Sequence, residues 1–233
     1  MEGRRVDLVP YDALPGPLLL ARVHTYGGAV SSQPTPEQFA DRVRRAADDQ
    51  GRLPVPAQAG WEIFPFAPES LQVRPLEPLQ LPEPPRGGEG GRACWSCPVP
   101  ERDVVWSSER WVLTGPGEAT GLPFVAMLLP RAHLDLGDLD DTHAGELGQL
   151  VVRLDRAVRS LPAVGRLHVN RWGDGGAHLH VFLMGRPAGM MQLRGSNLAL
   201  WEEMLPRVPA EESSAALRQV AVALEAWGGQ ARQ

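Results

Sequence analysis

Two histidines, His178 and His180, stand one apolar residue apart in the run Ala-His-Leu-His-Val-Phe. Successive side chains of a strand point to opposite faces, so both imidazoles would share one face, with Leu179 and Val181 on the other. A neutral imidazole is a nucleophile near neutral pH, and its neighbour can orient it or supply a proton. The pair indicates a compact catalytic site. Two half-buried polar residues at a sheet edge, or two metal ligands, are the alternatives that the pair alone leaves open.

A second group with chemical potential is the Cys94-Trp95-Ser96-Cys97 run, which holds both cysteines of the chain. In a reducing compartment this spacing is typical of a redox pair or of half a zinc site, and not of a structural disulfide. One such pair does not decide between the two.

The elements that must position these residues can be predicted from periodicity. Apolar residues recur at helical spacing through Leu147, Leu150, Leu154 and Val158, which predicts a long helix. Gly173-Asp-Gly-Gly supplies the backbone freedom of a tight hairpin turn. The predicted order is therefore strand, strand, helix, strand, strand, at residues 110–113, 124–129, 139–161, 166–172 and 177–184. We expect an α+β fold with an antiparallel sheet, and a last helix at residues 210–227.

The chain divides near residue 90. Proline stands at 75, 78, 82, 84 and 85, which predicts an extended connector. Before it, one helix is predicted near residues 35–50, and an apolar cluster at residues 61–66 is expected to pack on the later domain. We predict an N-terminal extension at 1–90, a domain at 91–209 and a C-terminal helix at 210–233.

Composition excludes some classes of protein. The net charge is −5, which argues against a general nucleic-acid binder, and all 23 basic residues are arginine, so any phosphate would meet guanidinium groups. No apolar run is long enough to predict a membrane span, and no signal peptide is predicted at the start. The expected location is the cytoplasm.

Taken in order, these pieces resemble the histidine-triad (HIT) superfamily. In that family a strand ending in Pro-x-x-His, here Pro130 to His133, precedes the long helix, and a hairpin carries His-x-His-x-His. The resemblance runs from about Cys94 to Arg186, in an actinobacterial-type form with an incomplete triad, Gly-Ala-His-Leu-His. It implies a HIT-like sheet with one long helix, and a homodimer.

The resemblance also implies roles for single residues. His178 falls on the central histidine, which in catalytic members attacks the α-phosphate of a nucleotide and forms a nucleotidyl-histidine, and His180 falls on the third, supporting histidine. Asn170 resembles the strand asparagine that contacts ribose or phosphate. Gly176 replaces the first histidine. After the strand, Arg186 is a candidate phosphate ligand, as, more weakly, are Gln192, Arg194 and Ser196.

Some members of the superfamily hold zinc with a Cys-x-x-Cys pair, a histidine at the position of His133, and the first histidine of the triad. Here Cys94, Cys97 and His133 would be three ligands of a structural zinc, and the position of the fourth is Gly176. Because structural zinc sites need four ligands, Asp174, His168 and His24 are the candidates for the last one.

The function predicted first is a nucleotide hydrolase or nucleotidyl transferase that acts through His178 on a phosphate-containing nucleotide and requires no cofactor beyond the possible zinc. Two alternatives stay open: a non-catalytic nucleotide-binding protein, which the loss at Gly176 favours, and a zinc-stabilised interaction protein.

Overall fold

A computed structural model describes residues 44–52, 55, 64, 66, 75 and 78–232. By their contacts, residues 46–233 form one unit and residues 1–45 another. The helix predicted near residues 35–50 falls largely outside the described residues, and Arg44 alone is helical in its described part. Of the predicted apolar cluster, Trp61 and Ile63 also lie outside the described residues. The rings of Phe64 and Phe66 contact each other, with a distance of 5.9 Å between their centroids.

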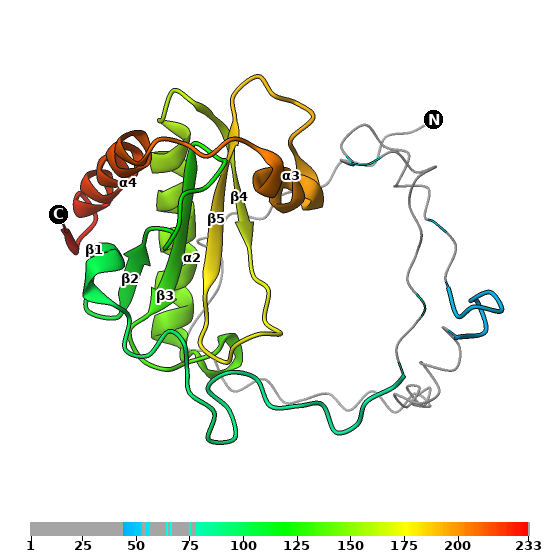
Figure 1. Cartoon of the computed structure of the whole chain (residues 1–233). Coiled ribbons are helices and arrows are strands. Elements are labelled where there is room, and N and C mark those ends of the chain that lie inside the picture. Colours follow the sequence, from blue (N-terminus) through cyan, green and yellow to red (C-terminus); the bar gives the residue numbers. More distant parts are fainter. Residues whose placement is uncertain are drawn as a thin grey trace, which may run out of the picture. The chain divides into compact units, whose positions relative to one another are not determined.

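Six antiparallel strands form one sheet in the order β4-β5-β3-β2-β1-β6 (Figure 1). Central strand β3 carries the alternating run Phe-Val-Ala-Met-Leu-Leu, which buries Phe124, Ala126 and Leu128 toward the helices. The strands are β1 (Val104–Ser107), β2 (Trp111–Thr114), β3 (Phe124–Pro130), β4 (Val164–Asn170), β5 (Val181–Pro187) and β6 (Gln230–Ala231).

Two helices cover one face of this sheet (Figure 1). Helix α2 (Asp141–Arg159) begins where the Asp140 carboxylate accepts a hydrogen bond from the His143 backbone N–H, and it buries an apolar stripe that includes Leu154. Helix α4 (Ala210–Glu225) buries Leu217, Val220 and Leu224 against the same core. Among the described helices, none combines the length and the apolar character that crossing a bilayer requires.

The opposite face of the sheet is covered near the end of β5. There the segment between β5 and α4, with helix α3 (Leu198–Met204), packs Leu193 and Leu198 on Leu122 and Met184. Short 3₁₀ turns complete the elements at Glu101–Asp103, Leu136–Asp138 and Gly195–Asn197.

The predicted α+β fold with one long helix and a C-terminal helix is confirmed. The second hairpin strand was predicted to begin at Ala177 but begins at Val181, because the residues before it bond to other segments: Ala177 N–H donates to the Gly87 carbonyl, and Leu179 N–H to the Leu134 carbonyl. Strand β1 was not predicted, since a four-residue apolar run carries no periodicity.

Candidate functional site

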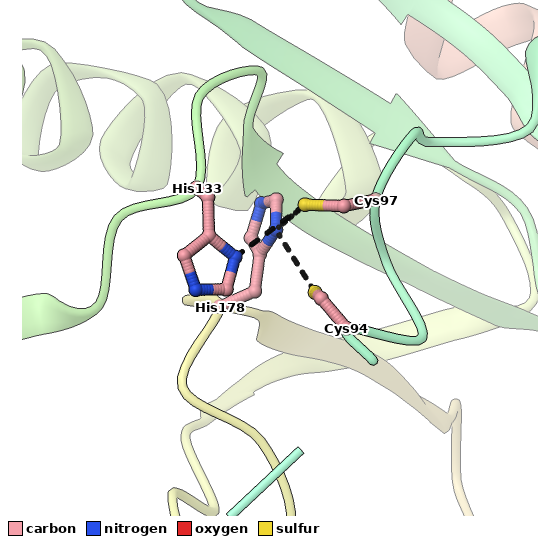
Figure 2. A group of neighbouring side chains, drawn as sticks. All are labelled: Cys94, Cys97, His133 and His178. Carbon is pink, nitrogen blue, oxygen red and sulfur yellow. Dashed lines mark hydrogen bonds between the residues drawn. The ribbon is translucent and has the colours of Figure 1, made fainter. Parts of the chain in front are cut away.

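Four side chains from three separate segments meet beside the sheet: Cys94 and Cys97 from the turn before β1, His133 from the turn after β3, and His178 from the residues before β5 (Figure 2). One possible ligand atom from each lies within 4.8 Å of all the others. Thiol sulfur and imidazole nitrogen in a two-plus-two set are donors typical of zinc. These four residues, called the metal centre below, could hold a metal ion such as zinc.

The distances in the metal centre suit a tetrahedral ion. The Nδ1 atom of His178 lies 3.0 Å from the Cys97 sulfur and 3.7 Å from the Cys94 sulfur, and the Nδ1 atom of His133 lies 3.4 Å from the Cys97 sulfur. Zinc–sulfur and zinc–nitrogen bonds of ordinary length at a tetrahedral angle place sulfur and nitrogen about 3.6 Å apart. Little movement would be needed to admit the ion.

The ring of His178 is oriented as a ligand. Its Nε2 lies 2.8 Å from the Pro130 carbonyl, which can only accept, so Nε2 carries the proton and the Nδ1 lone pair points toward the sulfurs. The side chain is fully buried. Burial is the main cause that lowers its pKa, with a smaller contribution from the neighbouring His133, and the neutral form that binds metal is therefore favoured.

The pKa of the Cys97 thiol is also shifted. Burial, followed by the neighbouring Cys94, raises the pKa of the Cys97 thiol to about 11. A bound cation would reverse that preference, because a metal favours the thiolate.

His178 occupies the place that the sequence left open for a fourth ligand. Among the described residues, neither Asp174 nor His168 joins the metal centre, and His24 lies outside them. The resemblance had placed this ligand at Gly176. A Cβ atom at residue 176 would lie 2.7 Å from Nε1 of Trp95, so the indole occupies that space and the ligand comes from two residues later.

His180 hydrogen-bonds to a backbone carbonyl through Nδ1, whereas His178 does so through Nε2. Its Nδ1 lies 2.9 Å from the His178 carbonyl, so Nδ1 carries the proton and the lone pair belongs to Nε2. Nε2 has no hydrogen-bond partner in the described part of the chain, and His180 as a whole is buried, at 7% exposure. The rings of Trp95 and Phe182 flank the imidazole, with centroids at 5.2 and 5.3 Å. Nε2 is therefore the nitrogen of His180 that could act as a nucleophile.

A scan against protein-family models finds no match to this sequence, and a search of curated proteins finds none either. Solved structures do share its fold. A histidine-triad protein from Bradyrhizobium japonicum is 20% identical with a TM-score of 0.43, covering 52% of this chain and 91% of its own. A zinc-bound histidine triad family protein from Mycobacterium smegmatis is 17% identical with a TM-score of 0.40, covering 53% and 84%. The fold is similar to that of histidine-triad proteins.

A uridylyltransferase structure is 20% identical to the chain with a TM-score of 0.37, covering 55% of this chain. This chain spans 42% of the uridylyltransferase. The likeness to these solved structures thus concerns about half of the chain.

The remaining predicted residues divide between two places. Asn170 ends β4 directly opposite Phe182, so its side chain shares the sheet face of Phe182 and His180. Arg186 does not join them. It lies six residues beyond His180, about 20 Å along an extended chain, and its buried guanidinium donates to the carbonyls of Pro187 and Met190. Gln192, Arg194 and Ser196 follow it toward α3.

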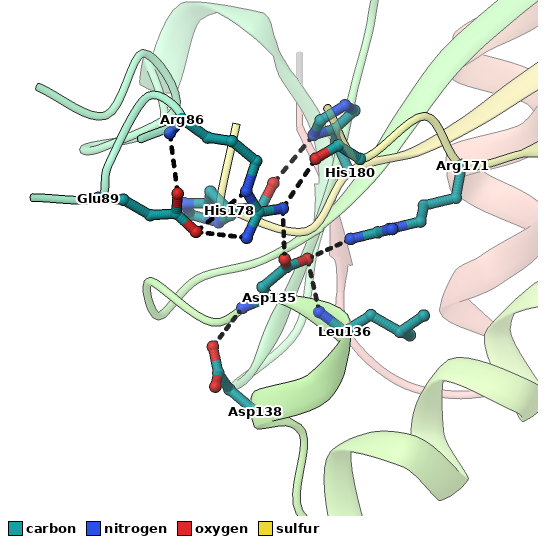
Figure 3. Close-up of polar contacts among 9 residues, drawn as sticks. Arg86, Glu89, Asp135, Leu136, Asp138, Arg171, His178 and His180 are labelled. Atoms are coloured by element: carbon teal, nitrogen blue, oxygen red, sulfur yellow. Dashed lines mark hydrogen bonds and ion pairs between the residues drawn. The ribbon is translucent and has the colours of Figure 1, made fainter. Parts of the chain in front are cut away.

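Sequence reasoning missed a polar group beside the metal centre (Figure 3). Arg86 and Arg171 both donate to the Asp135 carboxylate, at 2.8 and 2.7 Å. Arg86 directly follows the proline-rich run, which was interpreted only as a connector. Nothing in the sequence around Arg86 indicates that its side chain would pair with Asp135, 49 residues later.

A hollow of about 170 Å³ is lined in part by Trp95. Its walls include Thr114 and Met127 of the sheet, and Ser96 from between the two cysteines. The Ser96 hydroxyl is buried and has no hydrogen-bond partner among the described residues.

Proposed function

We propose that this chain is a nucleotide hydrolase or nucleotidyl transferase of the histidine-triad type, with His180 as the nucleophile and a structural zinc at the metal centre. The observation that carries the proposal is that the two histidines use different ring nitrogens for their hydrogen bonds to backbone carbonyls, Nε2 in His178 and Nδ1 in His180. His178 directs its Nδ1 lone pair to the cysteines, whereas the Nε2 lone pair of His180 has no partner among the described residues. The role of nucleophile, predicted for His178 from the sequence, therefore suits His180 better.

The chemistry needs one free imidazole nitrogen. Nε2 of His180 would form a bond to the α-phosphorus of a nucleotide, while the bond from phosphorus to the leaving oxygen breaks with its electron pair. Water, or an acceptor hydroxyl, would then cleave the nitrogen–phosphorus bond and return the neutral imidazole. The hydrogen bond from Nδ1 to the His178 carbonyl supports this step, because it stabilises the positive charge that the ring gains.

The hollow beside Trp95 is our candidate for the nucleoside part of the substrate. Trp95 lines this hollow and also contacts the His180 ring, at a centroid distance of 5.2 Å. Asn170, on the same sheet face, is the candidate contact for ribose or phosphate. Arg186 is too far along β5 for that role.

Zinc would serve the structure of this site. Bound to Cys94, Cys97, His133 and His178, it would tie three segments together and hold the residues that lead into His180. The zinc therefore would position the nucleophile without contacting the substrate.

The test compares purified, zinc-loaded wild type with His180→Ala and His178→Ala on nucleoside phosphoramidates, adenylyl esters and dinucleoside polyphosphates. His143→Ala, at the start of α2, is the matched control. We expect His180→Ala to lose turnover and keep zinc, and His178→Ala to lose zinc. Turnover that survives in His180→Ala would refute the assignment of the nucleophile.

A non-catalytic nucleotide-binding protein is the second candidate, and one observation favours it. With His178 at the first and His180 at the central position of His-x-His-x-His, the last position is Phe182, which cannot transfer a proton. Nucleotide binding without turnover in the wild type would select this candidate. The homodimer and the cytoplasmic location stay predictions.

A further inference from the structure

The segment at residues 85–92, called the strap below, lies against the residues that lead into His178. Gly87 forms a parallel bridge with Gly176: its N–H donates to the Gly175 carbonyl at 3.1 Å, and its carbonyl accepts from Ala177 N–H at 2.9 Å. The strap therefore pairs with the backbone immediately before a ligand of the metal centre.

One side chain anchors the strap. The Arg86 guanidinium donates to the Asp135 carboxylate at 2.8 Å and to the Gly173 carbonyl at 2.7 Å, and it also binds Glu89 within the strap (Figure 3). Arg86 thus joins the strap to the turn after β3 and to the β4–β5 hairpin. Its side chain is 28% exposed, so these bonds are partly shielded from water.

The strap also lies directly on the metal centre. Gly88 has a φ of +90°, and a Cβ atom there would lie 2.6 Å from Cε1 of His133 and 3.4 Å from Cβ of Cys94. The backbone of Gly88 therefore sits against the His133 ring. His178 is buried, whereas His133 and Cys97 are the exposed ligands, so release of a metal ion would begin with movement of these two, and Gly88 limits the movement of the His133 ring.

We propose that Arg86 is a positioning residue that latches the strap over the metal centre and thereby slows metal release. The inference rests on the metal centre proposed above. With the latch closed, Gly88 confines the His133 ring in its ligating position. With the latch open, His133 is free to rotate away, and the ion is lost by stepwise dissociation of its ligands.

The test measures zinc release from the full chain into excess chromophoric chelator by stopped flow. Arg86→Ala removes the latch, Arg86→Lys keeps the charge without the planar fork, and Arg92→Ala alters an exposed arginine of the same strap. Groups that hold metal ligands in place are typically worth about 10–100-fold in metal affinity, and Arg86 acts on His133 through the strap, so we expect release from Arg86→Ala to be about 10-fold faster. Arg86→Lys should be intermediate, and Arg92→Ala should match the wild type.

Thermal melting of the zinc-free variants separates the latch from general loss of structure. The inference requires faster release from Arg86→Ala with a zinc-free melting temperature near that of Arg92→Ala. Equal zinc release rates in Arg86→Ala and the wild type would refute the proposed role of Arg86 but would not contradict the proposed zinc site. A wild type that takes up no zinc would overturn both, and turnover is measured separately.

Discussion

Replacing Gly88 with alanine probes the contact between the strap and His133, and Gly91 provides a matched control. Both glycines have positive φ, +90° and +80°, but a Cβ atom at residue 91 meets nothing within 4 Å. Gly91→Ala therefore carries only the backbone strain, whereas Gly88→Ala adds a 2.6 Å contact with Cε1 of His133. The difference between the two variants isolates the contact with a metal ligand.

The expected changes in stability and in zinc affinity follow from the backbone strain and from the contact with His133. A left-handed conformation costs a residue with a Cβ about 1–2 kcal/mol, which for a domain of this size lowers Tm by about 2–8 °C. We expect that effect in zinc-free Gly91→Ala, with unchanged zinc affinity. In Gly88→Ala the His133 ring must move, and we expect zinc affinity to fall by about 10–100-fold as well.

The assay is competition for zinc against a chelator of known affinity, together with melting curves with and without zinc. Zinc should raise the melting temperature of Gly91→Ala as it does that of the wild type, and that of Gly88→Ala much less. Equal zinc affinity in the two variants would refute the argument that Gly88 confines His133.

Two further predictions concern stability. Leu154 is fully buried in α2, so Leu154→Ala should lower the free energy of unfolding by about 2–5 kcal/mol in urea denaturation, whereas Val152→Ala, at a half-exposed position of the same helix, should change it by less than about 0.5 kcal/mol. Burial, and then the charge of Arg186, lowers the pKa of His168 in the folded chain. The unfolded chain therefore takes up the proton first, and stability should fall as pH drops below about 6.5 toward the lower folded pKa. Urea denaturation at pH 7.5 and 5.5 should show a smaller difference in His168→Gln, and an unchanged difference would contradict the stated cause.

Much of the fold could be predicted from the sequence because the signals are local. The apolar spacing from Leu147 to Val158 predicted α2, and the Gly-Asp-Gly-Gly turn predicted the hairpin of β4 and β5. The Cys94–Cys97 spacing indicated a redox pair or half of a zinc site, whereas His133 was implied as a ligand only by the resemblance to the histidine-triad superfamily. The helical spacing, the turn and the Cys-x-x-Cys pair are each visible within a short stretch of sequence.

What only the tertiary structure decided is which group each side chain faces. Alternation predicted one strand face for His178 and His180, yet both precede β5, and the sequence does not show which ring nitrogen a carbonyl engages. Likewise, Arg86 meets Asp135 across 49 residues. Such contacts arise when distant segments pack together, and neither partner alone carries a local signal of the other. The sequence by itself therefore determined the long helix, the C-terminal helix and most of the sheet, and the packing of separate segments decided which groups His178 and His180 contact.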